Sequence, residues 1–138
     1  GMVLKTIKLI EEDQDDIELL ELWKDPEDEK PFVTTLFLQT LNLGEENAKD
    51  IDEATKNWEL ERIALMDIIL MKMALAEARS FKSIPLKVTL NEYIELSKYY
   101  STPKSNGFIN GVLDQLFEKQ TGSGVIVKTG RGLVEVPT

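Results

Sequence analysis

The chain has 138 residues, 42% of them hydrophobic, which is enough for one domain or for two small helical subdomains sharing a core. It contains neither cysteine nor histidine, so disulfides, thiolate metal sites, the usual zinc ligands and the common hydrolytic triads are absent. We therefore predict that the chain is not an enzyme and holds neither a metal nor a cofactor.

The hydropathy pattern argues against a membrane protein. Charged residues at Asp67, Lys72 and Glu77 interrupt the most apolar segment, so no run of about 18 uncharged apolar residues remains to span a bilayer. Lysines also interrupt the apolar run at the start, and no small-residue cleavage site of a signal peptide follows it. Because a chain without cysteine also suits a reducing compartment, we expect a cytoplasmic protein.

The formal net charge of -9 at first disfavours nucleic-acid binding, which usually requires a basic surface. The acids are unevenly distributed, however. Residues 11–29 hold eleven of the 25 acidic residues and a single base, Lys24, whereas residues 79–138 hold eight bases and five acids. The acidic surplus belongs to the N-terminal part, and the C-terminal part is mildly basic.

The N-terminal half predicts helices. Residues 1–24 read as short helices embedded in acids, and Asp25-Pro26 then gives a helix-start signal of N-cap and first-turn proline, although Pro31 is an alternative start. Apolar residues follow the helical period to about residue 41, where Gly44 indicates a stop or a break. A further helix is predicted over residues 45–56.

The C-terminal half contains the clearest helical patterns. Residues 63–78 are apolar nearly all round, which predicts a central buried helix against which the others pack. Pro85 begins the next helix, and Thr102-Pro103 repeats the pattern of N-cap and proline before the last one. The predicted core stripes are Leu86, Leu90, Tyr93, Ile94 and Ser97, then Phe108, Ile109, Val112, Leu113, Leu116 and Phe117.

Glycines punctuate the last helix and the tail. Gly107 and Gly111 lie inside the helix at a cost of about 1 kcal/mol each relative to alanine, which predicts close approach of a neighbouring helix or, as the functional alternative, a flat surface for a partner. Gly122-Ser123-Gly124 reads as a flexible joint, and the β-prone residues after it as an extended segment along the bundle or a mobile one. The predicted division is an acidic segment (1–24), a helical domain (25–121) and a flexible or extended tail (122–138).

The polar loop at residues 101–108 is the candidate functional site. It joins two predicted helices at a helix N-terminus, where backbone donors favour a phosphate. Tyrosines beside lysines are also typical of single-stranded RNA recognition, in which rings stack on bases. The alternative is an ordinary capped loop with half-buried tyrosines. The residues concerned are Lys98, Tyr99, Tyr100, Thr102, Lys104, Ser105 and Asn106.

Several segments together resemble a known family. Residues 84–114, with Asn110-Gly111-Val112-Leu113-Asp114 near their end, resemble the C-terminal half of the NusB family of bacterial transcription antitermination factors. The similarity continues upstream through Asn57-Trp58, Arg62-Ile63-Ala64 and residues 73–77. The resemblance implies an all-α, NusB-like helical bundle without catalytic activity, here with a short extended C-terminal tail.

The resemblance also implies partners. Proteins of this family pair with the ribosomal protein NusE, bind boxA-type single-stranded RNA and help to load an antitermination complex on RNA polymerase. Carried over by position, the RNA candidates are Lys98, Tyr100, Thr102, Lys104, Ser105 and Asn106, and the partner candidates are Asp67, Gly107 and Gly111. For Asp67 the alternative is an acid paired within the bundle.

One departure and two alternatives accompany this interpretation. The family usually begins with an arginine-rich helix, whereas this chain begins with Lys5 and Lys8 followed by acids, which suggests a fragment of a longer chain or a divergent protein with weakened RNA binding. One alternative is the NusB-like domain of rRNA cytosine methyltransferases, in which the motif at residues 110–114 generally ends in arginine rather than Asp114. The other is a module that binds only proteins.

Overall fold

A computed structural model of the chain describes residues 4–5, 7, 23–58 and 63–134. Contacts within the chain divide it into two units, Gly1–Val33 and Thr34–Thr138, and each is considered by itself. Most of the helices predicted for residues 1–24 lie outside the described residues. Of the few residues described in this range, Leu4, Lys5 and Ile7 are helical. The predicted limits at residues 24 and 121 stay a prediction.

The first long helix, α2 (Pro26–Asn42), begins at the earlier of its two predicted starts. The Asp25 carboxylate accepts a hydrogen bond from the Glu27 N–H (3.2 Å), and the Asp25 carbonyl accepts one from the Glu29 N–H (2.8 Å). Both bonds satisfy donors that a helix start leaves without partners, so the helix is already established when it reaches Pro31, which lies inside it.

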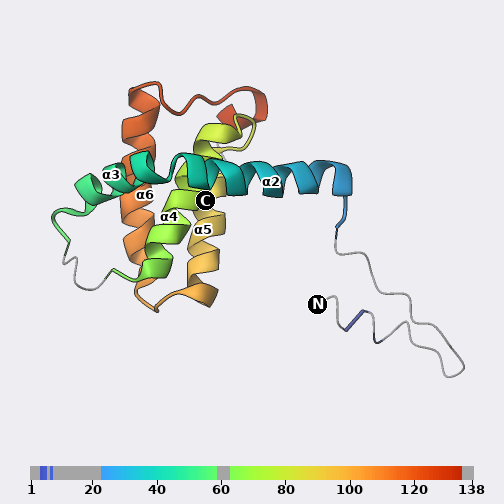
Figure 1. Ribbon diagram of the computed structural model, residues 1–138, viewed down its shortest axis with the longest axis horizontal. Helices are drawn as coiled ribbons and strands as arrows, with labels where there is room; N and C mark the ends of the chain where they lie inside the picture. Colours follow the sequence, from blue (N-terminus) through green and yellow to red (C-terminus); the bar gives the residue numbers. More distant parts are fainter. Residues whose placement is uncertain (1–3, 6, 8–22, 59–62, 135–138) are drawn as a thin grey trace, which may run out of the picture. The chain divides into compact units, whose positions relative to one another are not determined.

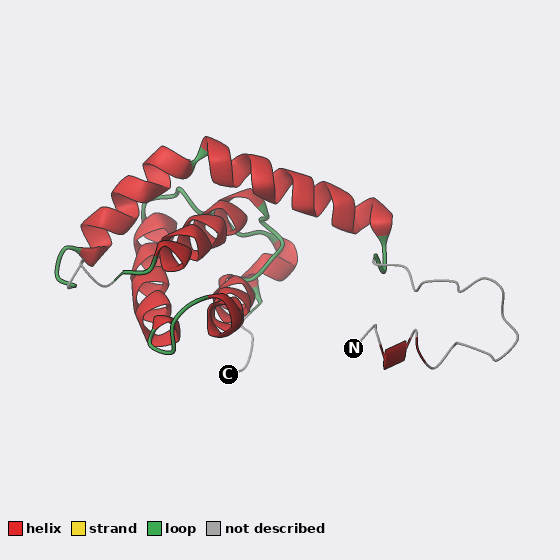
Figure 2. Ribbon diagram, turned by 60° about the horizontal axis from the view of Figure 1, so that its bottom comes forward, coloured by secondary structure: helices red, strands yellow, loops and turns green. Residues whose placement is uncertain are grey.

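Four helices form the larger unit beyond α2. They are α3 (Gly44–Thr55), α4 (Leu65–Ser80), α5 (Leu86–Tyr100) and α6 (Ser105–Gly122). Figure 1 shows α4, α5 and α6 side by side, and each of them contacts the other two. Helix α3 packs against α4 and α6. The described residues contain helices and loops but no strand (Figure 2), which confirms the predicted all-α class.

The core lies around α4, as its all-round apolar sequence predicted. Met71, Ala74, Leu75 and Ala78 have no exposed surface, and the alanines leave room for neighbouring helices to approach closely. The other helices and the tail contribute the remaining buried hydrophobic side chains, among them Ile51, Tyr93, Ile109, Val112, Leu113, Leu116, Phe117 and Ile126. The stripe predicted for α6 is confirmed from Ile109 to Phe117, and Phe108 is only partly buried against this core.

The C-terminal segment packs against the bundle through residue 132. Helix α6 continues through Gly122, and the chain then turns at Gly124, whose φ of 78° suits glycine. Ile126 is buried, and a short 3₁₀ helix follows, η2 (Gly130–Leu133). At Gly132 a Cβ atom would lie 2.0 Å from the Lys82 carbonyl oxygen, so only glycine allows this approach.

Lys128 attaches this segment to the end of α4. Its ammonium donates hydrogen bonds to the carbonyl oxygens of Ala78 and Phe81, both at 2.9 Å, where a cation also meets the negative end of the helix dipole. Burial lowers the pKa of Lys128 and raises the pKa of the Glu77 carboxyl, and the charge of each group opposes the shift in the other. The tail is therefore held at a specific point of the bundle.

The close approach predicted at Gly107 and Gly111 is wrong. A Cβ atom at Gly107 would meet nothing within 4 Å, and one at Gly111 would make an ordinary contact of 3.9 Å with the Trp58 ring. Both glycines are exposed, because the helices that pack against α6 meet its opposite, apolar side. The alternative interpretation, an open surface for a partner, stays a prediction.

This geometry makes alanine favourable at Gly111. Gly111→Ala should raise the free energy of unfolding by about 0.4–1 kcal/mol, because alanine loses less backbone freedom on folding and its methyl group fits beside Trp58. Urea unfolding followed by circular dichroism measures the change, with Gly132→Ala as a contrasting variant that should destabilise the bundle. A loss of stability in Gly111→Ala would contradict the open geometry.

The α5–α6 loop as candidate functional site

The loop between α5 and α6 is closed by hydrogen bonds between Thr102 and Ser105. The Ser105 N–H donates to the Thr102 carbonyl (3.0 Å), and the Thr102 N–H donates to Ser105 Oγ (3.1 Å). Helix α6 therefore begins at Ser105, two residues later than the predicted proline start at Pro103. The reason is that Thr102 and Ser105 form a turn that precedes the helix.

Asp67, in the first turn of α4, holds this loop in place through hydrogen bonds. Its side chain is 4% exposed and accepts hydrogen bonds from the Ser101 hydroxyl and from the Ser105 hydroxyl, the latter at 2.9 Å. Because the Ser105 proton is used there, the Thr102 hydroxyl, 2.8 Å from Ser105 Oγ, must be the donor in that contact. A buried carboxylate thus orders three hydroxyl groups.

These bonds change the roles of two predicted site residues. Ser105 is 1% exposed and its hydroxyl is fully used, so it cannot meet RNA directly, contrary to its prediction as an RNA contact. The Asp67 carboxylate likewise offers almost no surface to a partner. This agrees with the alternative that the sequence left open for Asp67, an acid paired within the bundle. Both residues position the loop.

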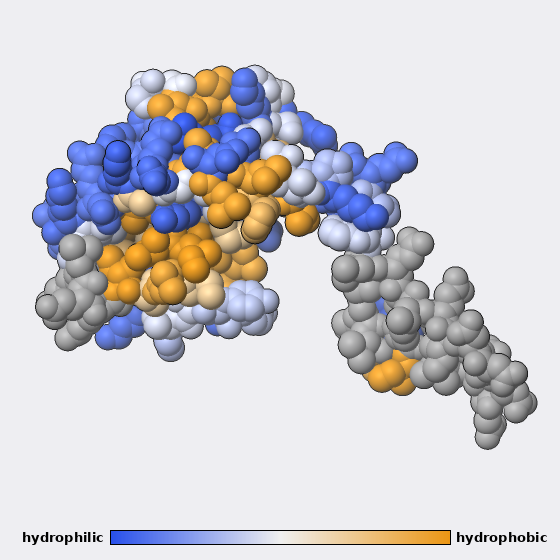
Figure 3. All heavy atoms as spheres, in the orientation of Figure 1, coloured by the Kyte–Doolittle hydropathy of each residue, from blue (hydrophilic) through white to orange (hydrophobic). Residues whose placement is uncertain are grey.

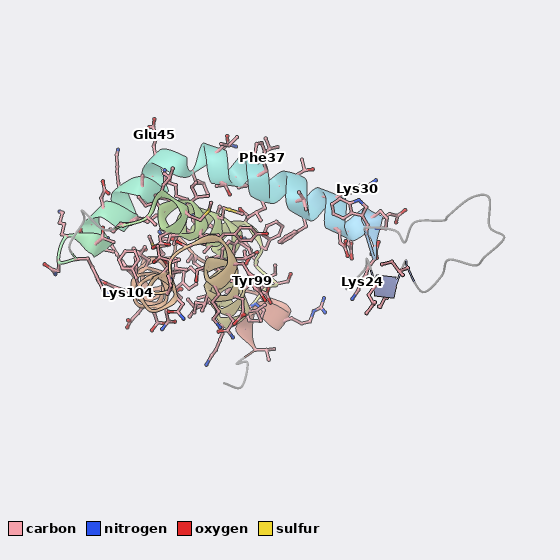
Figure 4. All side chains as sticks on the ribbon, turned by 90° about the horizontal axis from the view of Figure 1, so that it is seen from below. Lys24, Lys30, Phe37, Glu45, Tyr99 and Lys104 are labelled. Atoms are coloured by element: carbon pink, nitrogen blue, oxygen red, sulfur yellow. The ribbon has the colours of Figure 1, made fainter. Side chains whose placement is uncertain are left out.

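The other loop residues are exposed at the same end of the bundle. Lys104 and Thr102 are exposed, and Tyr99 and Tyr100 are 81% and 65% exposed, so the alternative of half-buried tyrosines is wrong. Figure 4 shows Lys104 at the start of α6 and Tyr99 at the end of α5. The side chains available for an external ligand are thus one lysine, one threonine and two tyrosine rings.

Two more of the predicted RNA residues, Lys98 and Asn106, already make bonds to neighbouring groups. The Lys98 ammonium lies 2.6 Å from the Glu95 carboxylate, and the Asn106 side-chain oxygen accepts the Gly107 N–H at 2.6 Å. Lys104 has no ion pair among the described residues, and the N-cap position that it occupies makes no side-chain capping bond. The free positive charge of the loop is therefore concentrated at Lys104.

A pocket of about 510 Å³ opens beside the loop. Trp58, which follows α3, forms one wall, and it is 46% exposed. Its ring meets that of Phe108 edge to face, with centroids 5.1 Å apart and an angle of 79°. The pocket is lined by Asn57, Trp58, Ile63, Asp67, Thr102, Lys104, Ser105, Gly107 and Phe108. An apolar aromatic wall therefore faces a basic and hydroxyl-bearing one.

Sequence reasoning did not place Trp58 in the site and gave Phe108, the last residue of the predicted loop, no role in binding. Phe108 belonged to the predicted core stripe of α6, and Trp58 stood 44 residues before the loop residue Thr102. The available signal was the pair Asn57-Trp58 among the segments that carry the family resemblance. Only the packing of the end of α3 beside α6 brings these two rings together.

The described residues contain neither a candidate metal site nor a membrane-spanning helix. They contain no group of three or more carboxylates, histidines or cysteines arranged to hold a metal ion. None of the helices in the described ranges is long and apolar enough to cross a membrane. The described residues thus define a small all-helical protein in which one interhelical loop exposes a lysine, a threonine and two tyrosines.

Within this class, the chain belongs to the NusB family, whose family model matches residues 2–118. It is 40% identical to the transcription antitermination protein NusB of Salinibacter ruber over 99% of this chain and 89% of that protein. Membership of this family of antitermination proteins agrees with the prediction that the chain is not an enzyme.

Two further relatives carry the same name. The transcription antitermination protein NusB of Chloroherpeton thalassium is 45% identical over 67% of this chain, and that of Natranaerobius thermophilus is 40% identical over 52%. These alignments cover 46% and 55% of the respective proteins, so the matched region is about half of each of these relatives. No solved structure matches the chain significantly.

The buried hydrogen bonds predict a structural role for Asp67. Asp67→Ala should lower the free energy of unfolding by about 1–3 kcal/mol, because it leaves the buried Ser105 hydroxyl and the partly buried Ser101 hydroxyl without their acceptor. Urea unfolding measures the loss, and Asp52→Ala, at an exposed acid of α3, should change stability by less than about 0.5 kcal/mol. Equal stability of both variants would contradict the anchoring role.

Proposed function

We propose that this chain is a transcription antitermination factor that binds boxA-type single-stranded RNA together with NusE. The chain's relatives are antitermination proteins named NusB, and the family resemblance implies both partners. The single observation that carries the proposal is the loop itself, where exposed Lys104 and two exposed tyrosines surround a helix start held in place by Asp67. A cytoplasmic location follows from this role.

The loop suits a single strand for a physical reason. Unstacked bases need exposed ring faces, which Tyr99 and Tyr100 offer, and a backbone phosphate needs a cation, which Lys104 offers. The chain as a whole is acidic, so general attraction to RNA is disfavoured. Binding therefore depends on these few contacts and on a partner that adds to them.

Trp58 and Phe108 extend this RNA site into the neighbouring pocket. A pocket of about 510 Å³ falls within the usual range of small-ligand sites, and the half-exposed Trp58 ring offers a face for one base. Asn57 and Thr102 on the pocket lining supply hydrogen-bonding groups for the edge of that base. The pocket thus receives a base while Lys104 meets the adjoining phosphate.

The NusE surface is assigned to the open side of α6. Gly107 and Gly111 are exposed, and a Cβ atom would meet nothing within 4 Å at Gly107 and only the edge of the Trp58 ring at Gly111, so another backbone can approach the helix closely there. Asp67 contributes indirectly by holding the adjoining loop. In this arrangement the partner and the RNA meet next to each other at the start of α6, which lets each strengthen the binding of the other.

Charge reversal at Lys104 tests the phosphate contact. Lys104→Glu should weaken binding of a fluorescent boxA-like RNA and lower the slope of log affinity against log salt by about 1, because one phosphate contact is lost. Lys49→Glu makes the same charge change at an exposed position of α3 and should have little effect. Equal loss in both variants would show that only net charge matters.

The same titration, repeated with NusE and with a scrambled RNA, tests the whole proposal. Binding that prefers boxA and tightens when NusE is added supports the antitermination role. Binding of NusE without any RNA preference would favour the alternative of a module that binds only proteins. NusE binding should be the same in wild type and Lys104→Glu, because the substitution leaves the open side of α6 unchanged.

Stacking on Trp58 gives a separate prediction. Trp58→Leu should lower RNA affinity by about 1–3 kcal/mol, the usual value of one stacked base, whereas Trp58→Phe should retain most of it. The measurement is RNA titration, supported by quenching of Trp58 fluorescence in a Trp23→Phe background. Unchanged RNA affinity in Trp58→Leu, with loss of NusE binding, would assign the pocket to the protein partner instead.

A further inference from the structure

A second and larger hollow lies between α5 and α6, with a volume of about 750 Å³. One face of each helix lines it over consecutive turns: Leu86, Lys87, Leu90 and Asn91 from α5, and Asn110, Asp114, Phe117, Glu118 and Thr121 from α6. At 1.5 Å per residue, the stretch from Asn110 to Thr121 is roughly 16 Å long. This α5–α6 groove shares no residue with the pocket beside the loop.

The groove has an apolar floor. Leu86 and Leu90 are partly buried against the core, and Phe117 is buried within it. The rim is polar, with Asn91 and Asn110 exposed on opposite helices. A floor of leucine and phenylalanine between polar rims is the arrangement by which a groove receives the apolar face of an amphipathic helix.

Two carboxylates on the α6 wall give the groove a charge preference. Asp114 and Glu118 are exposed four residues apart on one face of the helix, where like charges repel each other. Neither has an ion pair among the described residues. The neighbouring cation of α6, Lys119, turns to the other side and bonds Glu53 at 3.0 Å. The α6 wall therefore presents a pair of acids that this bundle leaves without a cation.

The groove continues toward the tail, and its α5 wall differs in charge from its α6 wall. A second hollow of about 430 Å³ continues from Leu86, Lys87 and Thr121 to the tail, where Leu133 and Val134 are exposed. Lys87 is the lysine of the α5 wall, and the tail lysine Lys128 is already bonded to the end of α4. Cations of a ligand would therefore face α6, and an acid of the ligand would face Lys87.

We propose that the α5–α6 groove docks a basic amphipathic α-helix of a protein partner. Its apolar residues, three and four positions apart, lie on Leu86, Leu90 and Phe117. Two lysines or arginines four residues apart meet Asp114 and Glu118. This docking is independent of RNA binding at the loop, so the protein has a second attachment point.

A synthetic helix tests the groove on the full chain. The probe is a fluorescent peptide of about 14 residues with leucines on one stripe and two lysines four apart beside it, and its control carries glutamates in place of the lysines. The double variant Asp114→Lys/Glu118→Lys should bind the lysine peptide at least about tenfold more weakly than wild type and should prefer the glutamate peptide.

A matched variant separates the groove from general charge attraction. Glu45→Lys/Asp52→Lys changes net charge by the same amount at exposed acids of α3, and should keep wild-type binding of the lysine peptide. NMR shifts caused by the peptide should map to residues 86–91 and 110–121. Asp114 and Glu118 lie outside the loop site, so RNA affinity should be unchanged in the groove variant if the loop binds RNA.

Three kinds of result would overturn the proposal. One is a dissociation constant of the lysine peptide for wild type weaker than about 1 mM, or an equal loss of binding in both double variants. Another is a peptide shift map centred on the exposed apolar residues Leu65, Met66 and Ile69 of α4 instead of on the groove. Figure 3 shows an apolar surface on the face of the bundle where Figure 1 draws α4. The third is a dimer of the free chain in sedimentation that Asp114→Lys/Glu118→Lys dissociates, because the groove would then hold a second copy.

Discussion

Packing of α3, α5 and α6 against the single helix α4 is the constraint on which the rest of this bundle depends. Met71, Ala74, Leu75 and Ala78 of α4 have no exposed surface, and the small alanines let the three neighbouring helices approach α4 closely. Polar contacts form at the two ends of α4. Asp67 at the start holds the α5–α6 loop, and the carbonyls of Ala78 and Phe81 at the end receive Lys128 of the tail.

The bundle carries two separate candidate surfaces, the α5–α6 loop and the α5–α6 groove. The loop end presents rings, hydroxyls and one free lysine on a chain of net charge -9, so the RNA binding that we propose there would rest on local placement and not on overall charge. The groove between α5 and α6 presents acids over an apolar floor and suits a basic protein segment. A factor with two such surfaces can hold RNA and proteins in one assembly without catalysis.

Local patterns predicted most of the helices and the core. The period of apolar residues placed the interior of α4 and α6, and Asp25-Pro26 placed the start of α2, because these features depend on neighbouring residues. Predictions that depended on distant residues were less successful. The glycines of α6 lie on its exposed side because the packed side of the helix is the opposite one. One local prediction also failed, because a turn between Thr102 and Ser105 precedes α6 and the helix begins at Ser105.

The sequence by itself determined the helical class, the central place of α4 and, through the segments at residues 57–58 and 84–114, the family. Periodicity and family motifs are properties of the order of residues and need no knowledge of distance. Only the tertiary structure decided that Asp67 and Ser105 are buried supports, that Trp58 meets Phe108, and that Asp114 and Glu118 line a groove. These facts depend on which helices come together, because burial and contact are set by packing between segments far apart in the chain.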